Sequence, residues 1–353
     1  GSAFGSIFFA AGVCNTVFGF VATRYAAASV MGVPGWRISI AVVAALSAVV
    51  GVAIAFCVSE PNAARLAEKR RTGSFLTVFS ENMPKVLQLF RYPTFVLILC
   101  QGAPGTAPWT VFPFFTQWLE LSCFNHGQAG LVFSAFGWGN AFSNLASGLL
   151  LNFVSRRFPD HGPPTIANFS IAVGVPFLVL LFFILPKPME SGADAGDVWT
   201  YFAVFLSFGL GAAMCGTINK KIFSDIVPPS IFTYVFAIDQ LIENCLGNCA
   251  GLAVGVLTDA VFKYDRTAVS ADGCAPAEAK KLGLGMFVVC TVAWIICFAV
   301  YLCVHCTYPK DRRLQLAQRS AFAQQKRVEA EAAKAELGRT DDSISTGTMS
   351  TKE

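Results

Sequence analysis

Two acidic residues, Asp239 and Glu243, interrupt a long apolar stretch of the sequence. Because they are four residues apart, both would lie on one face of a helix. Gln240 and Asn244 add a second polar row beside them. An ionisable residue inside a membrane-spanning helix is costly and indicates a functional site by default.

The sequence places no Lys or Arg at the same depth as these acids. A buried carboxyl without a basic partner tends to hold a proton, so it is suited to loading and releasing one. The alternative is a permanently protonated acid that only makes a hydrogen bond between helices. We predict a proton or polar-substrate site at Asp239, Glu243, Gln240 and Asn244.

Helix-breaking residues gather in a second apolar stretch, 93–119, which contains Pro104, Pro108 and Pro113 together with Gly102 and Gly105. Proline removes backbone hydrogen bonds, and broken membrane helices occur where they are buried or line a water-filled cavity. We therefore predict that this helix is interrupted. Its candidate cavity or gate residues are Gln101, Pro104, Pro108 and Trp109.

Two more rows of residues follow a helical spacing. Asn140 and Asn144 share one face of their stretch, where substrate contact and interhelical hydrogen bonding are both open. Gly247, Gly251 and Gly255 follow the acids at intervals of four residues. Small residues at this spacing let a neighbouring helix approach closely, so we predict a packing face.

Cys123 and Cys274 lie in predicted loops on one side, while the other ten cysteines lie in or beside apolar stretches. The two either form a disulfide, if the compartment is oxidising, or remain free thiols. The sequence contains no metal-binding Cys or His spacing, no GxSxG motif and no P-loop. We expect no metal, no cofactor and no catalytic residue.

The composition identifies the class of protein. Of 353 residues, 54% are hydrophobic and 14% are charged, whereas soluble domains carry about 25% charged residues. This excludes a soluble enzyme, and a net charge of +4 is too small to indicate a nucleic-acid partner. We predict an all-α integral membrane protein with eight spans of about 20 residues. The spans are 4–29, 37–58, 93–119, 128–153, 165–185, 198–218, 230–262 and 283–306.

The distribution of positive charge predicts the orientation. Of the 26 Lys and Arg residues, 19 fall in the segments 59–92, 154–164, 219–229 and 307–353. The positive-inside rule places these segments, and hence the C-terminus, in the cytoplasm. Residues 310–338 read as a charged helix, and we expect the polar end after it to be disordered.

One loop carries a family resemblance. The segment from Gly148 to Arg157, including Arg156, resembles the G-x-x-x-D-x-x-G-R-R signature of the major facilitator superfamily. Asn152 replaces the usual Asp and Ser155 the usual Gly. The resemblance therefore implies a cytoplasmic charge lock that is weakened or altered here.

The resemblance extends along most of the chain. The triplet at 35–37 is similar to the GWR that often joins the fifth and sixth helices of this superfamily, and the stretches 102–121 and 226–243 resemble its spinster-like branch. The eight spans then correspond to helices five to twelve. The implied divisions are 1–58, the last two helices of the first bundle; 59–92, a cytoplasmic linker; 93–306, a complete second bundle; and 307–353, a tail that is helical and then disordered.

The resemblance implies a secondary transporter that works by alternating access and is coupled to protons. Animal spinster proteins export lysolipids and sphingoid phosphates, so the implied substrate is a small or amphipathic organic solute in contact with membrane lipids. We expect the first four helices to come from a longer gene product or from a partner. The alternative function is a non-transporting membrane adaptor or sensor, which the Asn152 replacement favours. A plasma membrane and an endolysosomal-type organelle both remain open.

Overall fold

The computed structural model describes residues 2–26, 28–58, 80, 83–84, 87–188, 193–228, 231–268 and 273–347. These residues are almost entirely helical, which confirms the predicted all-α class. One short antiparallel hairpin pairs β1 (Ser29–Val30) with β2 (Val33–Pro34). Most of the predicted linker 59–92 and the last residues of the tail lie outside the described residues, so their predicted roles stay predictions.

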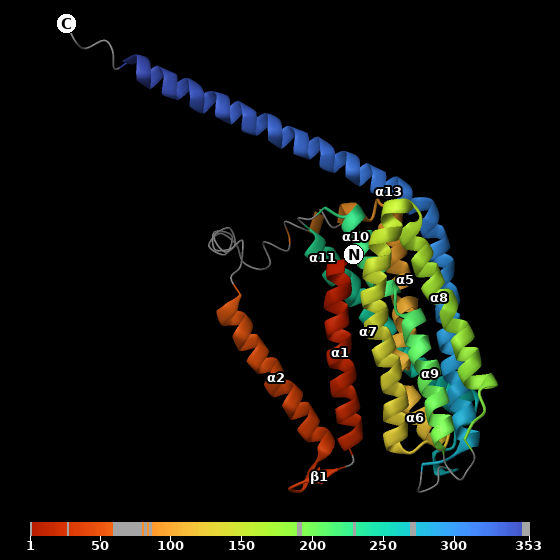
Figure 1. Cartoon of the computed structure of the whole chain (residues 1–353). Helices are drawn as coiled ribbons and strands as arrows, with labels where there is room; N and C mark the ends of the chain where they lie inside the picture. The colour runs from red at the N-terminus through yellow and green to blue at the C-terminus, as the bar shows by residue number, and fades with distance from the viewer. Residues whose placement is uncertain are drawn as a thin grey trace.

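All eight predicted spans fall on helices (Figure 1). The helices are α1 (Ser2–Tyr25), α2 (Gly35–Cys57), α5 (Pro93–Val111), α6 (Phe114–Leu121), α7 (His126–Arg157), α8 (Gly162–Val179), α9 (Ala195–Ala212), α10 (Cys215–Ile226), α11 (Phe232–Gly247), α12 (Cys249–Val256) and α13 (Pro276–Gly347). Two π-helical turns, η1 (Leu180–Ile184) and η2 (Leu257–Val261), continue α8 and α12, and the 3₁₀ turn η3 (Arg266–Ala268) follows.

Seven helical segments in the described part of the chain are long and apolar enough to cross a membrane. The predicted span 128–153 is not among them, although it lies within the 32-residue helix α7. Its glycines, serines and asparagines lower its apolarity. The chain is thus a multi-pass membrane protein whose α7 is the most polar of the predicted spans.

Two predicted boundaries are wrong. Residues 219–229 are not a turn, because α10 continues to Ile226 and carries Lys220 and Lys221 inside the helix. The last helix is longer than predicted, since α13 runs without interruption for 72 residues from Pro276 to Gly347.

The prolines interrupt the third span at one place only. α5 continues through Pro104 and Pro108, and the chain breaks between α5 and α6 beside Pro113. The predicted interruption is therefore confirmed at Pro113, whereas Pro104 and Pro108 lie inside α5 without breaking it. A proline inside a helix removes one hydrogen bond, and the surrounding packing tolerates it here.

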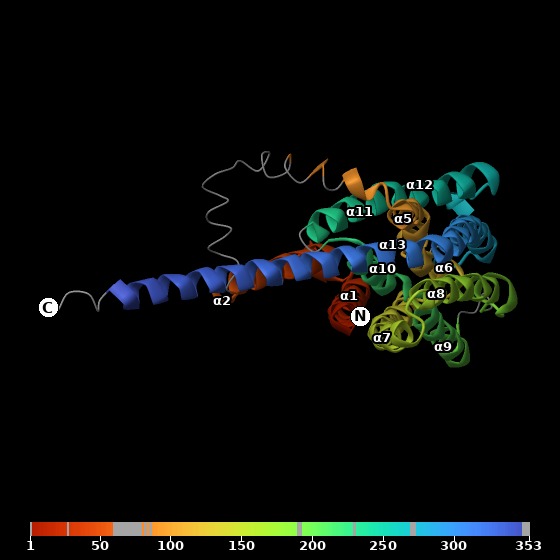
Figure 2. The same ribbon diagram turned by 90° about the horizontal axis from the view of Figure 1, so that it is seen from above.

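The helices form a bundle around α5 and α7. α5 packs against α11 and α13, and α7 packs between α1 and α9; Figure 2 shows this arrangement from above. Gly139 of α7 meets Gly209 of α9 so closely that a Cβ on either would clash with the backbone of the other helix. Aromatic rings fill the centre near the α5–α6 break, where Phe112 packs edge-on against Phe208.

α13 fastens one end of this bundle and then leaves it. Asp311 accepts a hydrogen bond of 2.8 Å from the backbone N–H of Thr94, where α5 begins. Arg312 and Arg313 both pair with Asp160, in the loop between α7 and α8. The hydrogen bond from Arg313 holds the pKa of the Asp160 carboxyl below its ordinary value.

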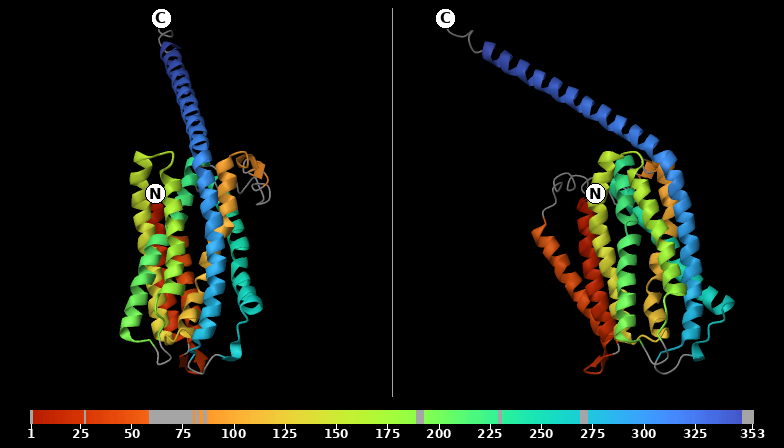
Figure 3. Two further views of the ribbon diagram at one scale, coloured as in Figure 1. Left: turned by 90° about the vertical axis from the view of Figure 1, so that its right-hand side faces the viewer. Right: turned by 45° about the vertical axis from the view of Figure 1, so that its right-hand side comes forward.

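Beyond these contacts α13 projects away from the bundle as a single helix (Figures 1 and 3). We call residues 320–347 of this helix the rod, and the end of the bundle that it leaves the rod end. The opposite end contains a disulfide between Cys123 and Cys274, and we call it the disulfide end.

Candidate functional site

The predicted acid Asp239 lies in the interior of the bundle and forms a buried ion pair. It comes from α11, and its side chain is fully buried. The Nζ of Lys220, from α10, lies 3.4 Å from its Oδ2. The other carboxylate oxygen, Oδ1, has no hydrogen-bond partner among the described residues. The prediction that no basic residue reaches the depth of these acids is wrong.

Lys220 is held in place by its surroundings. Its ammonium group also lies 4.0 Å from the centre of the Phe236 ring, one helical turn before Asp239. An aromatic face attracts a cation, so the ring and the carboxylate stabilise the same charge. Buried ionic side chains are normally paired, and Lys220 is 5% exposed.

Glu243 lies one turn beyond Asp239 on α11 and is partly buried. Its Oε2 accepts a 2.6 Å hydrogen bond from the side chain of Gln240. A Cβ added to Gly102 of α5 would lie only 2.6 Å from the Cγ of Glu243. Glycine at position 102 therefore leaves the space that the Glu243 side chain occupies. The middle of α5 and the acidic face of α11 therefore fit together at Gly102.

A cavity of about 250 Å³ opens beside these groups, and we call it the central cavity. Seven helices contribute to its walls, namely α1, α5, α8, α9, α10, α11 and α13, with polar side chains and aromatic rings facing the same space. The lining includes Phe8, Gln101, Trp109, Asn219, Lys220, Gln240, Glu243, Asn244 and Trp294. Gln101 is almost fully buried, and its Nε2 has no hydrogen-bond partner among the described residues. The cavity thus presents both positive and negative charge and an available amide donor.

The asparagines of α7 join a polar chain that leads to α10. Asn144 donates to Asn140 at 2.7 Å and accepts from Thr217 at 3.2 Å. Two residues on, the side chain of Asn219 accepts a hydrogen bond from the hydroxyl of Tyr301 on α13. These contacts favour interhelical hydrogen bonding for Asn144, since its side chain is satisfied without a ligand.

The sequence-predicted gate residues separate into two groups. Gln101 and Trp109 line the central cavity, whereas Pro104 and Pro108 are not among its lining residues. Trp109 also lines a second cavity of about 510 Å³ between α1, α5 and α7, which we call the α1 cavity. Asn140 lines this second cavity together with Phe20 and Phe133.

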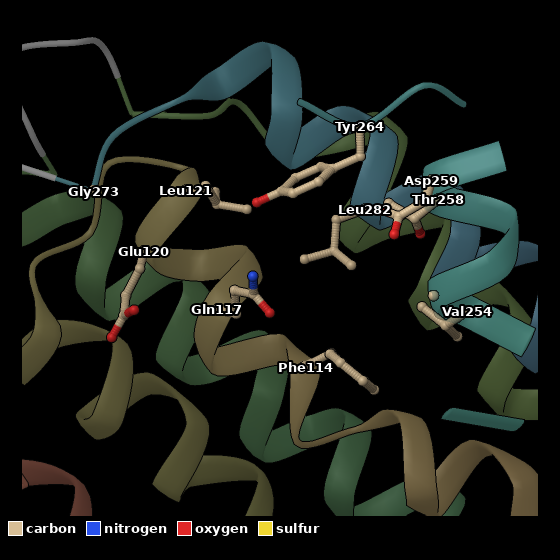
Figure 4. A pocket seen from close by; sticks show the side chains of 11 residues that line it. Phe114, Gln117, Glu120, Leu121, Val254, Thr258, Asp259, Tyr264, Gly273 and Leu282 are labelled. Carbon is tan, nitrogen blue, oxygen red and sulfur yellow. The ribbon is translucent and has the colours of Figure 1, made fainter. Parts of the chain in front are cut away.

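A third cavity, of about 590 Å³, lies at the disulfide end between α6, α12, η2 and α13 (Figure 4). In Figure 4 the side chains of Gln117 and Leu282 lie toward this space, while Glu120 points away from it. The Oε1 of Glu120 instead pairs with the ring of His126 at 2.5 Å. Gly255 is the one predicted site residue in its lining, so this cavity is separate from the acidic pair.

The predicted glycine row packs closely at one position. A Cβ on Gly247 would lie 2.8 Å from the side chain of Thr106 on α5. One on Gly251 would find only Phe114, at 3.8 Å, and one on Gly255 would meet nothing within 4 Å. α11 ends at Gly247 and α12 begins at Cys249, so the three glycines do not follow one straight helix.

The loop motif and the cysteines lie at opposite ends of the bundle. Gly148 lies close to Gly5 of α1, and a Cβ on Gly5 would be 3.1 Å from the Cα of Gly148. Asn152, Arg156 and Arg157 line an open hollow near the rod end. At the other end Cys123 and Cys274 form the disulfide that the sequence analysis left open.

Lys220 and Asn219 are functional candidates that the sequence analysis missed. Ile218, Ile222 and Ile226 recur every four residues and indicate one buried helix face, but Lys220 lies on the other side of the helix from them, so this spacing alone did not reveal it. The adjacent pair of lysines looked like a turn because charged residues in a row usually face water. In the structure α10 is buried on both sides, because Ile218, Ile222 and Ile226 are buried and so is Lys220.

Comparison with known proteins assigns most of the chain to a protein family. A family model described as Major Facilitator Superfamily matches residues 1–252. No curated protein matches the chain. The matched region contains α1 through α11, and therefore the ion pair, Glu243 and Gln101.

Proposed function

The chain belongs to the major facilitator superfamily, and on that premise we propose that it is a secondary transporter driven by protons. The observation that carries this proposal is the buried Lys220–Asp239 ion pair beside Glu243 in the central cavity. Its expected solute is a small or amphipathic organic molecule, moved by alternating access between two faces of the membrane.

The charge arrangement supports proton coupling. A proton that binds Asp239 removes the negative charge that holds Lys220, and the ammonium group is then free to attract another anion. Charges interact strongly in a site of low dielectric, so one proton changes the balance between two conformations substantially. A ligand shifts such an equilibrium only by its different affinity for the two states, and a broken ion pair supplies that difference.

The neighbouring carboxyl extends this role. Glu243 lines the cavity and is bound by the Gln240 amide, which also faces the cavity. A second acid within one helical turn gives the proton an adjacent site and gives a positively charged or hydroxylated solute a hydrogen-bond acceptor. Asp239 and Glu243 therefore act together in this proposal, with Lys220 as their common counter-charge.

The two adjoining cavities support an amphipathic solute. Trp109 separates the polar central cavity from the α1 cavity, which has aromatic and glycine walls. A polar head would bind near Lys220 and Glu243, and an apolar chain would lie along Phe20 and Phe133. This is consistent with the lysolipid or sphingoid type of solute that the spinster-like resemblance implies.

The test uses the full-length protein in proteoliposomes, with uptake of lysophosphatidylcholine and sphingosine 1-phosphate measured with and without an imposed pH gradient. We expect Asp239→Asn and Glu243→Gln to lower gradient-driven uptake at least about tenfold, equivalent to about 1.4 kcal/mol of coupling. Exchange of solute without a gradient should continue, because these variants keep the shape of the cavity.

Glu120→Gln is the matched control, since Glu120 is an acid outside the central cavity that pairs with His126. It should keep the pH response of the unmodified protein. If both cavity variants retain gradient-driven uptake, the proposed coupling role is wrong. If the unmodified protein binds these solutes but moves none of them in either condition, the adaptor or sensor alternative is favoured.

A further inference from the structure

A further cavity at the disulfide end is lined, among the described residues, by two lysines and by no acidic residue. It has a volume of about 410 Å³ and lies where η1 ends and α13 begins. Lys187 and Lys280 line it together with Phe182, Phe183, Leu185 and Leu284. We call it the lysine cavity.

Neither lysine has an ion-pair partner among the described residues. Lys187 lies with its Nζ 5.9 Å from the centre of the Trp118 ring. Partial burial and the nearby positive charge of Lys280 lower the pKa of Lys187. The arrangement therefore costs free energy as it stands, and a bound anion would remove that cost.

Lys281, the residue after Lys280 on α13, differs from Lys280 in having partners for its charge. Lys281 pairs with Glu278 at 2.7 Å and donates to the backbone carbonyl of Lys263 at 2.8 Å. Its charge is therefore neutralised within the fold. Lys280, one residue earlier, lines the lysine cavity and contributes an uncompensated charge to it.

A further donor lies beside the same space. The indole Nε1 of Trp118 is buried without a hydrogen-bond partner among the described residues. It lies 3.0 Å from where a Cβ on Gly283 would be, and Gly283 lines the lysine cavity. Lys187 and Lys280 thus line the cavity, and the N–H of Trp118 lies directly behind Gly283.

The position of Lys187 at the edge of a membrane-spanning segment favours a lipid as the source of the anion. Lys187 is three residues beyond Ile184, where the apolar segment Gly162–Ile184 ends. Phe183 is 52% exposed on the adjoining apolar surface. Lysines at the edge of a span reach the lipid headgroup region, while exposed aromatic and aliphatic side chains contact acyl chains.

We propose that the lysine cavity binds the headgroup of an anionic phospholipid, with Lys187 and Lys280 contacting the phosphate and Phe183 and Leu284 contacting the acyl chains. An ammonium group near the membrane surface attracts an acidic lipid headgroup by its charge. The site is distinct from the central cavity and does not depend on what the protein transports.

The experiment is native mass spectrometry of the purified full chain in detergent, titrated with dioleoyl phosphatidylglycerol. Each lysine near an anionic lipid contributes enough to change affinity about fivefold. We expect Lys187→Gln and Lys280→Gln each to weaken binding by about fivefold, and the double variant by about thirtyfold. Lys281→Gln removes the same charge from the neighbouring position and should leave binding unchanged.

Two further probes distinguish the possible ligands. Phosphatidylcholine, which has no net charge, should bind more weakly than phosphatidylglycerol, and glycerol 3-phosphate should not compete. Equal binding of the two lipids, competition by free glycerol 3-phosphate, or unchanged phosphatidylglycerol binding by the double variant would each overturn the proposal. Because Lys187→Gln and Lys280→Gln remove repulsion, both variants should fold, and their melting temperatures check this.

Discussion

At the scale of single residues, the ion pair between Lys220 and Asp239 is expensive to bury. Removing two charges from water costs several kcal/mol for each, and their mutual attraction offsets that cost only with good geometry. One oxygen of Asp239 lacks a partner among the described residues, so the offset is incomplete. The pair therefore adds little net stability, which is the expected condition for charges that must separate during function.

Removal of one member of the pair should be more harmful than removal of both. Lys220→Met leaves a buried carboxylate uncompensated, and we expect a loss of about 3–5 kcal/mol in unfolding free energy. The double variant Lys220→Met with Asp239→Leu should recover most of that loss but none of the gradient-driven uptake. Unfolding in mixed micelles measures the four proteins of this cycle. Additive effects of the two single changes would contradict direct coupling.

The two acids of the candidate site could be predicted from the sequence, whereas Lys220 could not. Asp239 and Glu243 stand out in the sequence because they are charged residues in an apolar stretch, and the structure places both beside one cavity. Lys220 belongs to a short segment of mixed charge that resembles a turn. Its burial depends on α10 packing against α8, α13 and α7, which local sequence does not reveal.

At the scale of elements, α5 and α11 meet through glycine on both sides. Gly102 of α5 admits the side chain of Glu243, and Gly247 of α11 admits Thr106. The hydroxyl of Thr110 also donates to the backbone carbonyl of Gly247 at 3.0 Å. This close contact sets the distance between the helix that carries the acids and the helix that carries Gln101.

A single added methyl group tests that contact. Gly247→Ala would place a Cβ 2.8 Å from Thr106, and overpacking of this kind costs about 1–3 kcal/mol. Gly255→Ala meets nothing within 4 Å, so it should be neutral or stabilising by up to about 1 kcal/mol, because Ala favours a helix over Gly. Melting temperatures in one detergent compare the two variants. Equal shifts would mean that α5 and α11 are not in close contact.

Helix positions followed from the sequence better than helix breaks did. Apolar length located every predicted span, because a membrane helix needs a run of about 20 apolar residues. The three prolines of the third span predicted a break but not its position, since packing can satisfy the backbone around Pro104 and Pro108 and only Pro113 lies at the break. The spacing of the glycine row likewise did not show where the neighbouring helix comes close, because close packing against Thr106 occurs at Gly247 and not at Gly255.

At the scale of the whole molecule, covalent and ionic ties fasten opposite ends of the bundle. The disulfide joins the end of α6 to the loop before α13, across 151 residues of sequence. At the rod end Asp160 and the backbone of Thr94 hold the same helix, through Arg312, Arg313 and Asp311. α13 is thus attached to α6 at the disulfide end and to α5 at the rod end.

Reduction of the disulfide should loosen this arrangement measurably. A disulfide that closes a long loop typically contributes about 2–4 kcal/mol, mainly by restricting the unfolded chain. We expect Cys123→Ser and a membrane-permeant reductant to lower the melting temperature by the same amount, with no further loss when they are combined. Cys100→Ser, at an exposed free cysteine, is the control. An unchanged melting temperature in Cys123→Ser would contradict this structural role.

Because α13 is one continuous helix, a small rotation at its bundle end would produce a large displacement at the end of the rod. Residues 320–347 extend about 40 Å at 1.5 Å per residue, and they follow directly after Arg319, whose guanidinium donates to the backbone carbonyl of Ser224. A rigid rotation of about 15°, a size known for subunit movements, would carry the free end about 10 Å. Fluorophores on Gly347 and on the α7–α8 loop would therefore report small movements of the bundle as large changes in distance.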